Sequence, residues 1–211
     1  MKKTILTVAF ALFAVVFAQA QVSGGLKAGL NLNNLNSSQD GFDMDSKLGY
    51  HFGAYLEANV SEKFSIQPEL LFSAQGAKRS ETYEDFGIKI SDDTKVNLNY
   101  LNVPVLVKFN INEMFNIYAG PQAGFVLSAK TKSEVEAMGH SEETEVDIKD
   151  DMKSIDFGLT FGVGVNLPAG LNATLRYNLG LSDTRENDDE GDAIKNGVFQ
   201  LSVGYRLFGG N

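Results

Sequence analysis

The sequence of 211 residues contains no cysteine, only four prolines, and fewer basic than acidic residues. Without cysteine, neither disulfides nor thiolate metal sites can contribute to the protein. The 18 basic residues against 27 acidic ones give a formal net charge of −9, whereas a nucleic-acid partner would require a basic face. Glycine is frequent at 21 residues, which together with few prolines fits crowded strands better than disorder. We therefore expect no nucleic-acid partner.

Long hydrophobic runs are absent after the first twenty residues. No later segment approaches the roughly eighteen consecutive apolar residues of a transmembrane helix. The N-terminus has a basic start, an apolar core over Ile5–Phe17 and small residues before a predicted cleavage site between Ala20 and Gln21. We expect a cleaved signal peptide, residues 1–20, and one domain over residues 21–211. An N-terminal anchor helix is the alternative, but the apolar core is short for a membrane crossing.

The most regular pattern in the chain is SIDFGLTFGVGVNL, Ser154–Leu167. Every odd position is apolar and every even position is small or polar, which places the two sets on opposite faces of a β-strand. The run is longer than a usual soluble strand of about five or six residues. It approaches the roughly 9–11 residues that a tilted strand needs to cross a bilayer. Its bulky face fits lipid, and its small polar face fits a crowded interior.

Similar alternation recurs along the chain and predicts eight strands. Their ranges are Gly24–Leu35, Lys47–Val60, Phe64–Lys78, Lys95–Ile111, Phe115–Lys130, Ser154–Leu167, Leu171–Ser182 and Asn196–Phe208. Three connections are turns of about three residues, at 61–63, 112–114 and 168–170, and the others are long. Short periplasmic turns alternate with long external loops in outer-membrane barrels. The expected fold is all-β, an eight-stranded antiparallel up-and-down transmembrane β-barrel.

The long connections are strongly acidic. The ranges 36–46, 79–94, 131–152 and 183–195 hold 22 of the 27 acidic residues. We expect these acidic loops to lie outside the cell and to contact an extracellular or envelope protein. The run Asp188-Asp189-Glu190-Gly191-Asp192 offers oxygen ligands for Ca²⁺ or Mg²⁺, but it lacks the spacing of an EF-hand loop. No metal site is therefore expected.

Two features interrupt the alternation. Pro68, Pro104 and Pro121 lie inside predicted strands, where each removes a donor from the hydrogen-bond ladder. The apolar parity also slips by one at Tyr100-Leu101. We interpret this slip as a β-bulge, which restores the facing of the strand.

Four basic and three acidic residues share the inward parity of the predicted strands. They are Lys27, Glu57, Glu69, Lys108, Asp156, Arg176 and Arg206. Buried charges persist only when they are paired, and an eight-stranded barrel is narrow enough for side chains to fill. We expect a salt-bridge network that plugs the lumen. A narrow conducting path and a ligand cavity are the alternatives.

The two histidines are the candidates for catalysis on lipid. His51 has inward parity in the second predicted strand, and His140 lies in the third acidic loop near Ser141 and Glu142. A catalytic triad is defined by spatial geometry, and no nucleophile-elbow motif surrounds either histidine. No catalytic residue and no cofactor is therefore expected.

Five segments carry a resemblance to a known family. They are Gly25–Asn31, Tyr100–Phe109, Tyr118–Pro121, Arg176–Leu181 and Leu201–Arg206. They resemble the PorT-like, OmpX-like outer-membrane β-barrel domain family, whose members are often labelled porin-family proteins. The resemblance covers the whole mature chain and implies that prolines at 104 and 121 are tolerated. It also implies that Ser202, Gly204, Tyr205 and Leu207 form part of the C-terminal signal read by the barrel-insertion machinery.

These observations together predict a non-enzymatic, monomeric protein of a Gram-negative-type outer membrane. Its expected partners are outer-membrane lipid and, during assembly, the barrel-insertion machinery. A small porin for passive diffusion and a secretion-assembly factor of the PorT type are the alternative functions. A soluble lipocalin-like barrel would carry its apolar residues inside, which is the opposite of the predicted faces.

Overall fold

The computed structural model describes five parts of the chain. They are residues 21–36, 45–85, 88–137, 140–184 and 195–209. The predicted signal peptide, parts of the first and fourth acidic loops and the run at 188–192 lie outside the described residues. Within the described parts, no helix is long and apolar enough to span a membrane.

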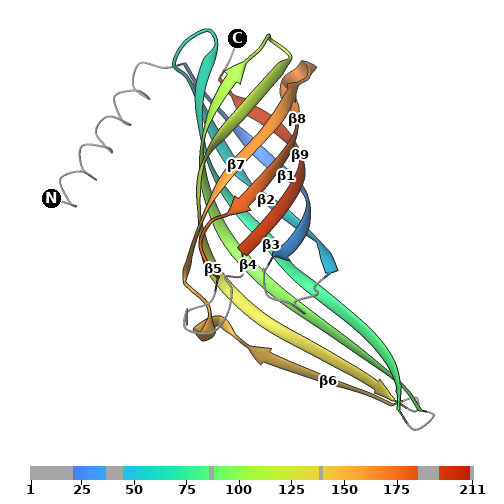
Figure 1. Ribbon diagram of the computed structural model, residues 1–211. Helices are drawn as coiled ribbons and strands as arrows, with labels where there is room; N and C mark the ends of the chain where they lie inside the picture. The colour runs from blue at the N-terminus through green and yellow to red at the C-terminus, as the bar shows by residue number, and fades with distance from the viewer. Residues whose placement is uncertain (1–20, 37–44, 86–87, 138–139, 185–194, 210–211) are drawn as a thin grey trace, which may run out of the picture.

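The described residues contain nine strands in one antiparallel sheet. The strands are β1 (Gln21–Asn36), β2 (Asp45–Asn59), β3 (Phe64–Asp85), β4 (Ile88–Asn110), β5 (Phe115–Ala137), β6 (His140–Asp147), β7 (Ile155–Asn166), β8 (Leu171–Gly180) and β9 (Lys195–Phe208). Two short 3-10 helices are η1 (Lys149–Asp151) and η2 (Pro168–Gly170). Eight strands follow the order β4-β3-β2-β1-β9-β8-β7-β5, and pairing of β4 with β5 closes them into a barrel (Figure 1). The predicted eight-stranded up-and-down barrel is confirmed.

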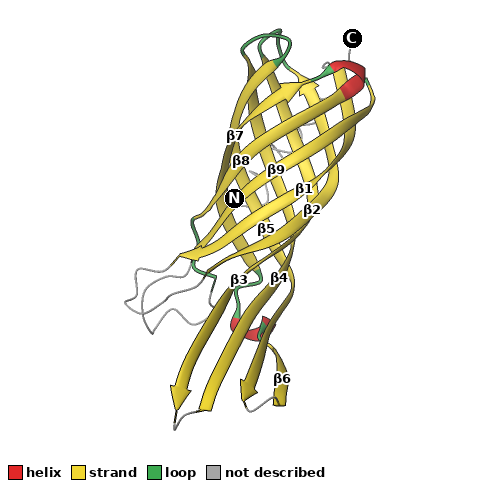
Figure 2. Ribbon diagram, turned by 90° about the vertical axis from the view of Figure 1, so that its right-hand side faces the viewer, coloured by secondary structure: helices red, strands yellow, loops and turns green. Residues whose placement is uncertain are grey.

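Three tight turns lie together at one end of the barrel, as predicted (Figure 2). In the first, the Ser61 hydroxyl accepts a hydrogen bond from the backbone N–H of Phe64 at 3.1 Å. In the second, Asn112 Oδ1 accepts from the backbone N–H groups of Met114 and Phe115 at 2.9 and 2.7 Å. In the third, Ala169 and Gly170 have positive φ, 60° and 78°. Side-chain acceptors and left-handed residues thus reverse the chain without long loops.

At the other end, β3, β4 and β5 continue beyond the barrel as a protruding sheet (Figure 1). These strands have 22, 23 and 23 residues. Strand β6 pairs with the end of β5 and completes the sheet, which we call the extension sheet: 79–85, 88–95, 130–137 and 140–147. The prediction that 79–94 and 131–152 are loops is therefore wrong for most of their length. A strand with water on both faces has no apolar face, so it lacks the alternation used for the prediction.

A register shift occurs close to Tyr100, but the extra residue is not in the strand where we predicted it. Asn99 pairs with Ser128 and Tyr100 pairs with Val126, so the additional residue is Leu127 in β5. The predicted bulge in the fourth strand is wrong in its placement. Strand β4 itself has no bulge and keeps its facing. Leu98 and Tyr100 are apolar although they point inward, where they pack with Val126 and Ala129 at the end of the lumen. These two residues change the polarity pattern of the sequence and imitate a slip.

The three unusual prolines do lie within strands. Pro68 pairs with Val105, and Pro121 pairs with Leu159. The β2–β3 ladder is interrupted beside Pro68 and resumes at Ile66 in the same register. The missing donors therefore cost ladder bonds locally and leave the alignment of the barrel unchanged.

The two faces of the barrel are inverted relative to a soluble protein. Large apolar side chains are exposed on the outer face, for example Leu30, Phe161 and Leu201 at 53%, 48% and 58%. Outer aromatic rings contact each other across strands, and Tyr177 lies 4.5 Å from the Phe199 ring, centroid to centroid. The buried residues are mostly polar and point inward. This arrangement suits a lipid-facing belt around a polar interior.

Candidate functional site in the lumen

Three charged side chains from three separate strands meet at the centre of the lumen. Glu69 of β3 accepts from Lys27 Nζ of β1 through Oε1 and from Arg176 Nη1 of β8 through Oε2, both at 2.7 Å. All three residues are at least 97% buried. Gln67 Nε2 also donates to Glu69 Oε1, at 2.6 Å. One carboxylate therefore joins three strands of the barrel by charge-assisted hydrogen bonds.

Uncharged polar groups continue this cluster toward the extension end. Gln200 Oε1 accepts from Arg176 Nε at 2.5 Å, and Gln200 Nε2 donates to Asn31 Oδ1 at 2.8 Å. Asn31 Oδ1 also contacts His51 Nδ1 at 2.7 Å. The hydroxyl of Ser202 lies 2.7 Å from His51 Nε2. These residues form a continuous buried network across β1, β2, β8 and β9.

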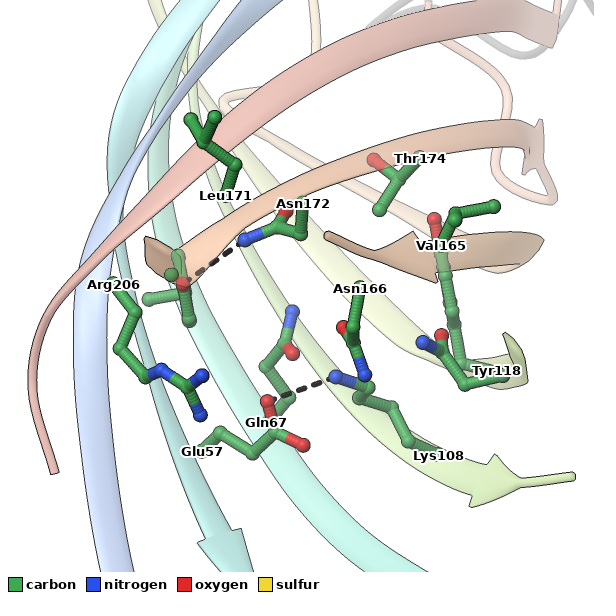
Figure 3. Close-up of a pocket in the computed structure, with 13 residues that line it drawn as sticks. Glu57, Gln67, Lys108, Tyr118, Val165, Asn166, Leu171, Asn172, Thr174 and Arg206 are labelled. Atoms are coloured by element: carbon green, nitrogen blue, oxygen red, sulfur yellow. Dashed lines mark hydrogen bonds and ion pairs between the residues drawn. The ribbon is translucent and has the colours of Figure 1, made fainter. Parts of the chain in front are cut away.

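A second ion pair lies nearer the tight turns. Lys108 Nζ donates to Glu57 Oε2 at 2.8 Å. Beside this pair is a cavity of about 40 Å³, which we call the turn-end cavity, and Arg206 lies at its rim (Figure 3). The described residues provide no ion pair or hydrogen bond for the Arg206 guanidinium.

The opposite end of the lumen is less charged. Asp156 accepts hydrogen bonds from Ser182 Oγ and, at 2.9 Å, from Asn196 Nδ2. Among the described side chains, none forms a salt bridge with Asp156. A small apolar cluster of Leu98, Tyr100, Val126 and Ala129 packs at this end. A cavity of about 20 Å³ lies beside Asp156.

The comparisons with known proteins identify the family. Residues 17–186 match the family model for the outer membrane protein beta-barrel domain. The chain belongs to this family. Its members are barrels of an outer membrane, so the chain is an outer-membrane protein. Among curated proteins, none matches the chain in sequence.

Several solved structures are similar to this chain over most of their length. Ail, the attachment invasion locus protein of Yersinia pestis, is 18% identical over 89% of this chain and 99% of its own, with a TM-score of 0.47. Neisserial surface protein A is 11% identical over 87% and 97%, with a TM-score of 0.49. The outer membrane protease OmpT from Escherichia coli is 9% identical over 89% and 94%, with a TM-score of 0.37.

The seven charged residues predicted for the barrel interior divide into separate groups. The structure brings Lys27, Glu69 and Arg176 together and pairs Glu57 with Lys108. It places Asp156 at the extension end with neutral partners and Arg206 at the exposed rim of the turn-end cavity. The single network that we predicted is thus two ion-paired groups and two separate charges.

The uncharged members of the interior were missed by the sequence reasoning. Asn31, Ser73, Gln200 and Ser202 are all at least 99% buried. Each has the same inward parity as the predicted charges, so parity applied to amides and hydroxyls would have found them. Their cross-barrel partners follow from the strand register, which the alternation alone does not give.

His51 has hydrogen-bond connectivity that resembles a Ser–His–amide triad, through Ser202 and Asn31. Ser202 and His51 are each 1% exposed, and neither lines the two cavities described above. A nucleophile must reach its substrate, and this serine faces the packed interior of the outer-membrane barrel. His140 lies on the extension sheet in β6, so the two histidines belong to different regions (Figure 1).

Acidic groups do not gather into a metal site in the described part of the barrel. Among these residues, no group of three or more histidine, aspartate or glutamate side chains has a metal-binding arrangement. The acidic run at 188–192 lies outside the described residues, so the prediction about it stays a prediction.

Proposed function

We propose that this outer-membrane barrel is a non-enzymatic envelope protein with a closed lumen and an acidic sheet that contacts partners outside the cell. The lumen carries its ion pairs and amides across the barrel axis. The extension sheet carries 11 acidic residues on strands that project beyond the belt of exposed apolar side chains. The two parts give the protein a structural role in the membrane and an interaction role at the surface.

The observation that supports a closed lumen most directly is the contact of Glu69 with Lys27 and Arg176. A charged cluster that is almost fully buried is stable only when its charges are paired, and Glu69 pairs with both cations, although Arg176 Nη2 has no hydrogen-bond partner among the described residues. An ion moving through the lumen would have to separate these groups. The partners come from strands that are far apart in sequence, so separation would disturb several strands at once.

Planar-bilayer recording of the refolded mature protein tests this part of the proposal. We expect no stable single-channel steps from protein whose folding is confirmed by its heat-dependent gel shift. A variant with Lys27→Ala, Glu69→Ala and Arg176→Ala should remove the cluster and admit ions. Stable steps from the unmodified protein would contradict the closed lumen and support a small porin. Steps from the variant alone would support the proposal.

The surface role is supported by the composition of the extension sheet. Asp93, Glu134 and Glu143 are direct neighbours on adjacent strands. All eight residues of β6 are exposed. Like charges in one cross-strand row are unfavourable for the isolated sheet, so a basic partner surface would relieve them. We infer that the partner outside the cell is a protein with a basic contact face.

Orientation can be tested because the chain has no cysteine of its own. Ser141→Cys places a thiol on exposed β6, and Glu62→Cys places one at the first tight turn. A membrane-impermeant maleimide should label the first variant on intact cells. It should label the second only after the outer membrane is permeabilised. The reverse pattern would contradict an external position of the acidic sheet.

We also infer that the chain belongs to the PorT-like, OmpX-like branch of the family and is exported by its signal peptide. The five segments that resemble this branch, including Tyr100–Phe109, support the first inference. The composition of residues 1–20, with its basic start, apolar core and small residues before Gln21, supports the second. The intact mass of protein isolated from the outer membrane should correspond to a chain beginning at Gln21.

A further inference from the structure

The turn-end cavity lies at the mouth of the barrel, where the strands enter the tight turns. It is lined by side chains of β2, β3, β4, β5, β7, β8 and β9. Figure 3 shows the Arg206 guanidinium turned toward the side chains of Glu57 and Gln67. Lys108 and Arg206 outnumber Glu57 among the charged lining residues. The local charge therefore favours an anionic group.

Uncharged groups in the same cavity have unused hydrogen-bonding capacity. Asn116 and Tyr118 are 3% and 5% exposed, and Asn116 Oδ1 has no hydrogen-bond partner among the described residues. The hydroxyls of Tyr118 and Thr174 also line the cavity, and neither has a hydrogen-bond partner in the described part of the chain. Native proteins rarely leave buried polar groups in this state without an ordered water or another polar group beside them. The hydroxyls can donate to an anion, and Asn116 can accept from a donor beside it.

The size of the cavity limits the anion. One water molecule requires roughly 10–15 Å³ of such volume, so about 40 Å³ holds about three water-sized groups. A carboxylate has three heavy atoms, whereas phosphate has five. A guanidinium binds either anion through two parallel hydrogen bonds, so the choice of carboxylate rests on the size of the cavity.

We propose that the turn-end cavity binds a carboxylate group, with Arg206 as its principal charged partner. The hydroxyls of Tyr118 and Thr174 donate to the same group. The Lys108–Glu57 pair forms the wall of the site, and Glu57 limits its affinity for anions by repulsion. The carboxylate arrives from the turn side, either on a small soluble acid or at the C-terminus of a peptide.

An NMR titration of the refolded protein in detergent micelles tests this site with acetate and with inorganic phosphate. The readouts are the Arg206 Nε–H resonance and the Tyr118 backbone amide. We expect saturable shifts with acetate and none with phosphate at equal ionic strength. Equal binding of both anions would overturn the choice of carboxylate. Absence of binding by either would overturn the site.

Three variants make the result specific. Arg206→Gln should weaken acetate binding about tenfold or more, because it removes a charge-assisted hydrogen bond. Glu57→Gln should strengthen binding, because it removes the repelling charge. Arg79→Gln is the matched control on the extension sheet and should have no effect. Equal binding by the Arg206→Gln variant and the unmodified protein would overturn the assignment.

A further comparison distinguishes the two sources of the carboxylate. An N-acetylated dipeptide with a free C-terminus is titrated against its C-terminal amide. If the free acid binds more tightly than acetate and the amide does not bind, the proposal is supported with a peptide end as ligand. If the free acid binds no better than acetate, a small soluble acid is supported. Equal binding of the acid and the amide would overturn carboxylate recognition.

Discussion

At the scale of single residues, Glu69 holds the charges of the central lumen together. Replacing it as Glu69→Gln keeps the shape of the side chain but leaves Lys27 and Arg176 buried without a counter-charge. Removing one partner of a buried ion pair typically costs about 3–5 kcal/mol. We expect the free energy of unfolding in lipid vesicles to fall by about this amount, measured by denaturant titration with the gel shift as readout.

Glu81→Gln is the matched control for this prediction. Glu81 also accepts from an arginine, Arg79, at 2.5 Å, but both side chains are about half exposed. Exposed pairs contribute roughly 0–1 kcal/mol, so this variant should unfold almost as the unmodified protein does. Similar losses of unfolding free energy for Glu69→Gln and Glu81→Gln would show that the buried ion pairs of the central cluster contribute no more to stability than an exposed pair.

The residues of the lumen also mark how far a sequence can predict a site. The alternation of side chains along each strand predicted that Lys27, Glu69 and Arg176 point into the barrel, because this alternation is a local property of a strand. It did not predict that Glu69 joins the other two while Asp156 has no cation. That outcome depends on the strand register and on which strands face each other across the barrel, both of which are non-local.

At the scale of elements, the strands that carry an apolar face were found, and those that do not were missed. The eight barrel strands alternate because one face meets lipid. The ends of β3, β4 and β5 and the whole of β6 have water on both sides, so their sequences contain no such pattern. Leu98 and Tyr100 gave a false signal for the opposite reason, because they are apolar and inward.

The stability of the extension sheet should depend on pH through the ion pairs between β5 and β6. Lys130 Nζ donates to Glu145 at 2.6 Å, and Lys132 Nζ donates to Glu143 and Glu145 at 3.0 and 3.1 Å. Hydrogen bonds from Lys130 and Lys132 lower the pKa of Glu145, and bonds to the glutamates raise the pKa values of both lysines.

A lowered carboxyl pKa stabilises the folded sheet above the ordinary pKa of glutamate, and this contribution is lost as the pH falls through the folded-state value. The raised lysine pKa values contribute at pH values below their ordinary range, and that contribution is lost only in strong alkali. The protection of the β6 backbone amides against hydrogen exchange, corrected for the intrinsic exchange rate, should therefore be constant near neutral pH. This protection should be lost below about pH 4.5.

Glu145→Gln should flatten the acid limb of this profile, because it removes the titrating group. Glu142→Gln is the matched control on the same strand, since Glu142 has no ion pair among the described residues. An acid limb that is unchanged in Glu145→Gln would show that these ion pairs do not hold β6 on the sheet.

At the scale of the whole molecule, the exposed apolar belt should coincide with the membrane. Leu201 pairs with Leu30 and Leu175, and all three are more than half exposed on the outer face of the barrel. Val146 has a similar exposure, 52%, but lies on the extension sheet. Exposure alone does not distinguish these two sites. Their positions along the barrel axis predict lipid around Leu201 and water around Val146.

Arginine substitution separates the two environments. A lipid-facing arginine costs about 2–4 kcal/mol at the bilayer midplane and less toward the interfaces, whereas a water-facing one costs little. We therefore expect Leu201→Arg to lower the free energy of unfolding in vesicles far more than Val146→Arg does, in paired denaturant titrations. In detergent, which adapts its shape to the protein, the difference should shrink. Equal effects of the two substitutions in vesicles would place the extension sheet at the same depth as the barrel and contradict its projection into water.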